Sequence, residues 1–163
     1  MTKEDLGHLI IASTDSLYRI SKSILRNETD CEDAVSEAIV KSFDKINTLQ
    51  HASYAKTWLV RILINECYRI YRQKQFAPSN DFTFKENLSD EADYSELYHA
   101  MMQLDDKYRI PVELYYIEGY KIHEITDILN RSEGTIKSQL ARGRQQLRKY
   151  LESEAAQLIK III

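Results

Sequence analysis

Four side chains that form directional hydrogen bonds share one face of a helix predicted near the C-terminus. They follow one another at i, i+3, i+4 and i+7: Thr135, Ser138, Gln139 and Arg142. A helix lying in the major groove of DNA reads base edges with the residues near its N-terminus. A Gln side chain matches the hydrogen-bonding edge of adenine, and an Arg side chain that of guanine. The spacing therefore indicates a base-reading face, with an ordinary solvated helix face as the alternative.

The rest of the same segment fits a helix that carries such a face. On the opposite side a buried stripe is predicted from four positions: Ile136, Leu140, Gly143 and Leu147. Basic residues beside the polar face are placed for contacts with phosphates: Lys137, Arg144 and Arg148. Gly134 costs about 1 kcal/mol relative to Ala inside a helix. Close approach of DNA or the geometry of helix initiation would account for that cost.

A second, shorter helix is predicted directly before this one. It covers residues 121–129, and Ile122, Ile125 and Leu129 lie on one side of it. A tight connection over 130–132 follows, in which Ser132 is a good N-cap for a helix running from Glu133 to at least Arg148. The order of helix, short turn and helix predicts a helix-turn-helix, the usual support of a base-reading helix.

Charge is distributed unevenly along the chain, whose net charge of −3 taken alone argues against nucleic acid. Residues 56–75 carry five basic side chains and one acidic one, and residues 131–149 carry six and one. Residues 76–103 carry one Lys against six acidic residues. Two basic segments separated by an acidic connector fit contact with a polyanion at two places.

The elements that must position these residues are all helical. Gly and Pro are scarce, and no run alternates apolar and polar residues. Helical spacing predicts helices over about 6–25, 30–45 and 54–75, with a Thr2–Asp5 capping box and Asp30 as the cap of the second. Residues 76–91 have the composition of a linker. Helix is predicted again over 92–104 and from Asp105-Asp106 to about 117, with Pro111 bending the latter or marking its start, and with Gly119 as terminator.

Several other kinds of site are not expected. Cys31 and Cys67 form neither a CxxC motif nor a metal-ligand spacing with the four His, so we expect free thiols, no metal and no cofactor. The N-terminus lacks the apolar core of a signal peptide. No apolar run reaches the roughly 20 residues of a membrane span. A cytoplasmic location is therefore expected.

Two stretches of the sequence resemble the extracytoplasmic-function (ECF) sigma factors of bacterial RNA polymerase, of the sigma-70 family. Residues 104–151, with Gly134-Thr135-Ile136-Lys137-Ser138-Gln139-Leu140 at their centre, resemble region 4. Asp30-Cys31-Glu32-Asp33-Ala34, with the residues that follow to Phe43, resembles region 2.2. Lys56-Thr57-Trp58-Leu59, with Arg61, Asn65, Arg69 and Arg72, resembles regions 2.3 and 2.4. The resemblance covers about residues 6–152, with Gln139 standing where the family often has Arg.

The resemblance implies two small helical domains, a region-2-like helical bundle and a region-4-like helix-turn-helix, joined by a flexible acidic linker. The implied limits are 1–75 for region 2, 76–95 for the linker, 96–152 for region 4 and 153–163 for a hydrophobic tail. It also implies a transcription initiation factor without catalytic activity, one that takes part in a stress response and has no small-molecule substrate. Its partners would be core RNA polymerase, promoter DNA and an anti-sigma factor, which in the family is often membrane-bound.

Roles for individual residues follow from the same resemblance. The −35 element would be read as duplex by residues of the helix-turn-helix: Thr135, Lys137, Ser138, Gln139, Arg142, Arg144 and Arg148. The melted −10 strand would be captured by residues of the 54–75 helix and the preceding loop: Lys56, Arg61, Asn65, Tyr68, Arg69 and Arg72. The 30–45 helix would dock on polymerase through charged residues: Glu32, Asp33, Glu37 and Lys41.

Some alternatives stay open at this point. Trp58 is either a stacking platform for a base or a core residue, and the second is favoured at the start of a packed helix. The chain could also be a helix-turn-helix regulator that acts without polymerase, or a sigma-like adaptor that no longer melts DNA. The first of these leaves the 30–45 and 56–72 motifs without a role.

Overall fold

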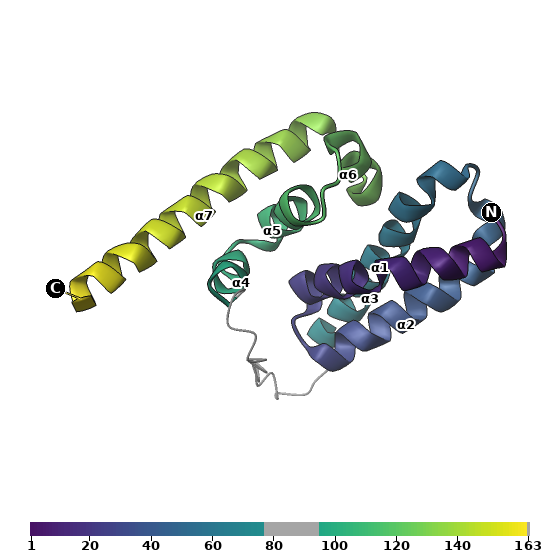
Figure 1. Ribbon diagram of the computed structural model, residues 1–163, viewed down its shortest axis with the longest axis horizontal. Coiled ribbons are helices and arrows are strands. Elements are labelled where there is room, and N and C mark those ends of the chain that lie inside the picture. The colour runs from purple at the N-terminus through teal and green to yellow at the C-terminus, as the bar shows by residue number, and fades with distance from the viewer. Residues whose placement is uncertain (77–94, 163) are drawn as a thin grey trace. The chain divides into compact units, whose positions relative to one another are not determined.

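The computed structural model describes residues 1–76 and 95–162, and every regular element in these ranges is helical (Figure 1). Seven α-helices follow one another: α1 (Lys3–Leu25), α2 (Glu28–Asp44), α3 (Ala55–Phe76), α4 (Ser95–Met102), α5 (Asp106–Val112), α6 (Ile122–Leu129) and α7 (Glu133–Ile162). Two short 3-10 turns, η1 (Ile46–Thr48) and η2 (Ala52–Tyr54), precede α3, and a π-helical turn, η3 (Glu113–Ile117), follows α5. The predicted all-α fold is confirmed, whereas most of the predicted linker lies outside the described residues.

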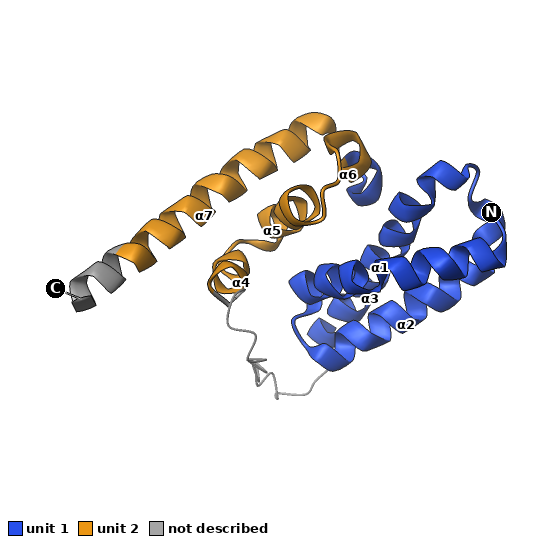
Figure 2. Ribbon diagram, in the orientation of Figure 1, with its two compact units in different colours: residues 1–86, 126–130 blue, residues 87–125, 131–163 orange. Residues whose placement is uncertain are grey.

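The chain divides into two compact units (Figure 2). One comprises residues 1–86 together with 126–130, and the other residues 87–125 and 131–163. In the first, α1, α2 and α3 all pack against one another. Its core is made of aliphatic residues that recur at helical spacing and are almost fully buried: Leu6, Leu17, Ile20, Ala34, Ala38, Leu59 and Leu63. A bundle of three amphipathic helices thus presents its polar faces outward.

Helix starts in the first unit follow from capping side chains. The Thr2–Asp5 capping box is confirmed, because Asp5 N donates to Thr2 Oγ1 at 3.1 Å and Thr2 N donates to Asp5 Oδ2 at 3.0 Å. The prediction that Asp30 caps the second helix was wrong. Asn27 is the cap, and its Oδ1 accepts the Asp30 N–H at 3.1 Å.

Asp30 has a different role from the one predicted. It is buried, and its carboxylate forms an ion pair with Lys74 of α3. Because α2 begins at Glu28, Asp30 lies inside the first turn, and Asn27 stands at the capping position. Asp30 therefore fastens the start of α2 to the end of α3.

In the second unit α7 packs chiefly on α5, and Gly143 is one of the residues in this contact. A Cβ added at Gly143 would lie 2.6 Å from Val112 Cγ2 and 3.4 Å from Tyr108 Cβ. Gly143 therefore sits where the α7 backbone meets the side chains of α5 without space for a methyl group. This explains its place in the stripe predicted to be buried.

Pro111 lies inside α5, which starts at Asp106 as the acidic pair predicted. Since proline has no N–H, it removes one i to i−4 hydrogen bond. The next turn, η3, has π-helical hydrogen bonding, such as Glu118 N to Glu113 O at 3.0 Å. Gly119, at φ +77°, ends this stretch in the left-handed conformation, as predicted for a terminator.

The last helix is one continuous element to Ile162. The segment predicted as a separate tail from residue 153 thus continues the helix that bears the polar face, and the side chains of 156–163 lie outside the described residues. Within the described part of the chain, no helix is both long and apolar enough to cross a membrane.

Candidate nucleic-acid interface

The N-terminus of α7 is fixed by Ser132, as predicted. Thr135 N donates to Ser132 Oγ at 3.2 Å, and the two hydroxyl oxygens lie 2.8 Å apart. The turn before it is tightened by Asn130, whose φ of +53° is left-handed. The cap at Ser132 therefore fixes where α7 begins.

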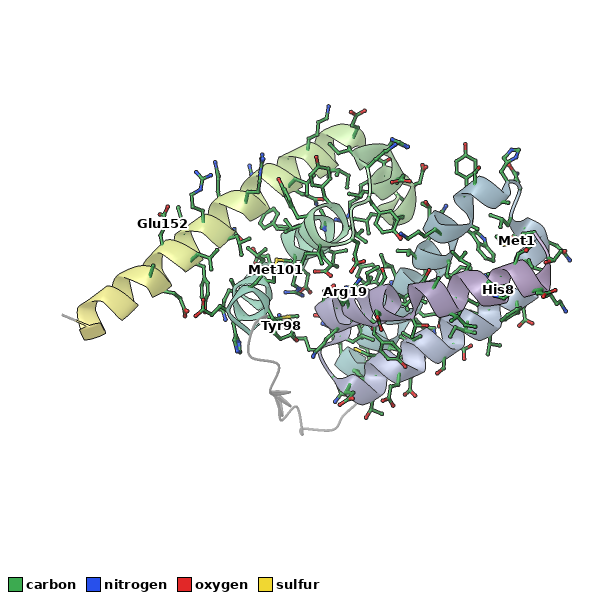
Figure 3. The ribbon with its side chains drawn as sticks, viewed as in Figure 1. Met1, His8, Arg19, Tyr98, Met101 and Glu152 are labelled. Carbon is green, nitrogen blue, oxygen red and sulfur yellow. The ribbon has the colours of Figure 1, made fainter. Side chains whose placement is uncertain are left out.

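The two faces of α7 divide as the spacing predicted. Ile136, Leu140 and Gly143 are buried and Leu147 is half-buried. Six of the seven predicted −35 residues are exposed: Thr135, Lys137, Ser138, Arg142, Arg144 and Arg148. Gln139, the seventh, is half-buried. In Figure 3 nitrogen-bearing side chains project from α7 along the stretch between α6 and Glu152. The face is therefore open to a large ligand.

Several polar and basic side chains near the start of α7 are held by a neighbour. Arg131 Nη1 donates to Gln139 Oε1 at 3.1 Å. Arg142 hydrogen-bonds the hydroxyl of Tyr108, and this bond is the main reason that the pKa of Tyr108 is lowered. Lys137 Nζ lies 2.9 Å from Glu133 Oε1 and holds the pKa of that carboxyl below its usual value. These contacts limit the rotamers of the face before any ligand arrives.

The second predicted interface lies on α3. Arg61, Asn65, Tyr68 and Arg72 fall at i, i+4, i+7 and i+11, which places them on one stripe. Arg61, Asn65 and Arg72 are exposed, and Tyr68 is half-buried. Lys56 is exposed in the first turn of α3 and does not belong to this stripe. The structure thus brings four of the six predicted −10 residues together.

Arg69, the remaining −10 residue, is engaged within the bundle. Its Nε donates to Glu66 Oε2 at 2.8 Å, and its Nη1 donates to Gln73 Oε1 at 3.3 Å. Trp58, at the start of α3, is half-buried. It is therefore neither a fully buried core residue nor a fully exposed stacking platform.

The predicted polymerase-binding residues lie along α2. Glu32 and Asp33 are exposed, while Glu37 and Lys41 are half-buried. Lys41 differs from the other three because its ammonium group forms an ion pair with Glu66 of α3. The ammonium group of Lys41 is thereby directed toward α3 rather than outward.

Glu66 and Arg131 are the two residues that sequence reasoning did not single out. Burial alone would raise the pKa of Glu66, but hydrogen bonds from Lys41 and Arg69 outweigh it and hold the pKa below its usual value. The available signal was that Glu66 is the lone acid in the basic 56–75 segment. For Arg131 the signal was a basic residue inside the turn, eight residues before Gln139.

The two thiols are buried and free. Burial raises the pKa of both Cys31 and Cys67, so neither is poised as a thiolate nucleophile. Among the described residues no three His, Cys, Asp or Glu side chains cluster as metal ligands.

Two family models match the chain, one to each unit. Sigma-70 region 2 matches residues 9–77, and Sigma-70, region 4 matches residues 94–147. The chain belongs to the sigma-70 family. The family predicted from the sequence is thereby confirmed. The predicted role as a factor for promoter-specific transcription initiation is confirmed as well.

The relatives of this sigma-70 family member span nearly its whole length. RNA polymerase sigma factor SigV of Bacillus subtilis (strain 168) is 27% identical, and the match covers 94% of this chain and 95% of the relative. The ECF RNA polymerase sigma factor SigW of the same strain is 28% identical, with 84% and 83% covered. The sigma factor RpoE, solved in complex with the anti-sigma factor NepR from Bartonella quintana, has the same fold. Its TM-score is 0.74 at 22% identity, with 91% of this chain and 98% of that one covered.

Proposed function

We propose that this sigma-70 family member brings core RNA polymerase to promoters by reading two DNA elements with two separate faces. The −35 element is read as duplex by α7, and the melted −10 strand is captured by α3. The observation that carries the proposal is the division of α7 into a buried stripe and an exposed polar and basic face. A helix of this kind reads base edges from its N-terminal turns.

On α7 the proposed contacts are of two kinds. Thr135, Ser138, Gln139 and Arg142 face base edges, where hydrogen-bond patterns differ between bases. Lys137, Arg144 and Arg148 form a second exposed stripe of α7, and we assign to them the contacts with phosphates, which position the helix without reading sequence.

On α3 the proposed site combines cations with an aromatic residue, as single-strand binding requires. Lys56, Arg61 and Arg72 supply exposed positive charge, and Asn65 and Tyr68 supply hydrogen bonding and a ring on the same helix. Arg69 takes part through the helix surface that it shares with Glu66. We assign the docking on polymerase to α2 and its acidic residues Glu32, Asp33 and Glu37, with Lys41 at the border to α3.

The proposed factor has two domains, a linker and a tail. Region 2 would span 1–75, the linker 76–95, region 4 96–152, and a hydrophobic tail 153–163. The protein would act in the cytoplasm as a non-catalytic factor in a stress response. An anti-sigma factor would bind it and hold it inactive; the sigma factor RpoE, which has the same fold, was solved in complex with the anti-sigma factor NepR.

Run-off transcription tests the proposal directly. The full chain is added to core RNA polymerase with genomic DNA fragments, and start sites are mapped. Initiation at a limited set of sites that share a −35 and a −10 element is expected. A lack of initiation at any site would overturn the proposal, and initiation without open-complex permanganate reactivity at −10 would remove the strand-capture part.

A further inference from the structure

One hydrogen bond at the polar face of α7 fixes the orientation of the Gln139 side-chain amide. Arg131 lies in the turn just after Asn130, and its Nη1 donates to Oε1 of the half-buried Gln139 at 3.1 Å. Both residues belong to the same compact unit. The contact therefore joins the turn of the helix-turn-helix to the second turn of its reading helix.

The direction of the Gln139 amide follows from the chemistry of its partner. A guanidinium group has five N–H donors and no acceptor. The atom of Gln139 that faces Arg131 must therefore be the carbonyl oxygen, and the amide nitrogen must point elsewhere. A flipped amide would set its N–H groups against the N–H groups of Arg131. The contact with Arg131 therefore fixes which way the Gln139 amide is oriented.

This orientation limits what Gln139 can read. Bidentate recognition of adenine needs both amide atoms on one base edge, because the oxygen accepts from N6 while the nitrogen donates to N7. In Gln139 the oxygen is turned toward Arg131, whose N–H takes one of the two lone pairs of that oxygen. The NH2 group points away from Arg131 and is the freer part of the amide to face a base. An NH2 group pairs with acceptors, which guanine and thymine carry in the major groove and adenine carries at N7, while cytosine presents an amino donor there.

We propose that Arg131 is a specificity-determining positioning residue that turns Gln139 into a hydrogen-bond donor toward the −35 duplex. The base at the Gln139 position must then offer an acceptor, and adenine gains a bidentate contact only where the second lone pair of the oxygen also reaches its N6 amino group. The inference rests on the proposed function, since it takes α7 as the helix in the major groove. It replaces the simpler expectation that Gln139 selects adenine.

The experiment compares full-length variants with core polymerase on duplex templates whose −35 region is randomised. Templates that yield run-off transcript are sequenced for the wild type, Arg131→Ala, Gln139→Ala and Lys149→Ala. Lys149 is an exposed cation on α7 two turns beyond Arg142, the last residue of the proposed base-reading set, so its variant controls for the loss of one positive charge. The position that loses its preference in Gln139→Ala identifies the base that Gln139 reads.

At that position the wild type should disfavour cytosine by about tenfold relative to the other bases, the scale of one good base contact. Arg131→Ala should free the Gln139 oxygen and raise adenine over guanine and thymine by about tenfold at that position only. Lys149→Ala should leave the preference unchanged, which separates a change of specificity from the loss of a positive charge.

Two results would overturn the inference while leaving the proposed function in place. In the first, Arg131→Ala weakens initiation uniformly, as Lys149→Ala does, with unchanged base preference at the Gln139 position. In the second, Gln139→Ala changes the preference at no position although the wild type has a clear −35 preference. A wild type that initiates without any −35 preference would instead overturn the proposed function.

Discussion

The carboxylate of Glu66 on α3 pairs with the ammonium group of Lys41 on α2. Its other oxygen accepts from Arg69 Nε at 2.8 Å, so one buried acid holds a cation from each of two helices. Lys41 belongs to the predicted docking helix and Arg69 to the predicted −10 helix. Glu66 therefore connects the two surfaces through the bundle.

Removing the charge of Glu66 should destabilise the first unit. Glu66→Gln leaves the two cations without a counterion, and loss of one partner of a buried pair costs about 3–5 kcal/mol. Lys41 and Arg69 are a third or more exposed, so solvent screening reduces the expected loss to about 1–2 kcal/mol. Urea unfolding followed by the fluorescence of Trp58, the single Trp of the chain, reports this unit. Asp15→Asn, an exposed acid on α1, is the control and should change the midpoint little.

Acid should destabilise the same unit through the same residue. The pKa of Glu66 is lower in the folded than in the unfolded chain, so the unfolded state binds more protons as the pH falls. The stabilising contribution is complete above the unfolded value of about 4.3 and is lost as the pH falls through the folded value. Urea midpoints between pH 7 and pH 3 should fall more steeply in the wild type than in Glu66→Gln. Parallel curves would contradict this assignment.

Gly143→Ala should destabilise the second unit although Ala favours helix. The propensity gain is about 1 kcal/mol, and overpacking costs typically 1–3 kcal/mol. The new methyl would lie 2.6 Å from Val112 Cγ2. The cost of overpacking should therefore exceed the propensity gain, and the free energy of unfolding should fall by about 1 kcal/mol. Hydrogen exchange of the α5 and α7 amides measures it. Val112→Ala removes the clashing methyl and should make the double variant more stable than the sum of the single changes predicts.

Gly134→Ala separates the two explanations for a glycine at the start of α7. Nothing lies within 4 Å of a Cβ added there, so the change should stabilise the free protein by up to about 1 kcal/mol. If the DNA backbone approaches this turn closely, the same methyl should weaken −35 binding, measured with core polymerase on a mapped promoter. Unchanged binding would leave helix initiation as the explanation.

Helix positions and faces could be predicted from the sequence because they depend on residues three or four apart. The burial of Ile136 and Leu140 and the cap at Ser132 are cases of this kind. The start of α2 was misplaced because Asn27 and Asp30 can both cap, and the local sequence does not show that Asp30 pairs with Lys74, far along the chain. The roles assigned to individual DNA-binding and polymerase-binding residues remain predictions.

Partners across the fold could not be predicted, because periodicity gives a face and not the neighbour that the face meets. Glu66 is 25 residues from Lys41, and nothing local pairs them. The bond between Arg131 and Gln139 joins residues eight apart, which is neither of the spacings that bring side chains together on one helix face. The faces of the candidate site were therefore predictable, whereas the contacts that orient its side chains were not.

The last prediction separates base reading from phosphate binding on α7. Arg142 lies on the polar face and is held by Tyr108, whereas Arg148 lies in the flanking basic set. Arg142→Ala should lose about 1–3 kcal/mol of discrimination at one −35 position. Arg148→Ala should weaken binding at all sequences alike and lower the slope of log K against log salt by about 1. Binding to −35 variants at several salt concentrations measures both effects. Because the two residues carry the same charge on one helix, equal and sequence-independent losses would show that the face assignment is wrong.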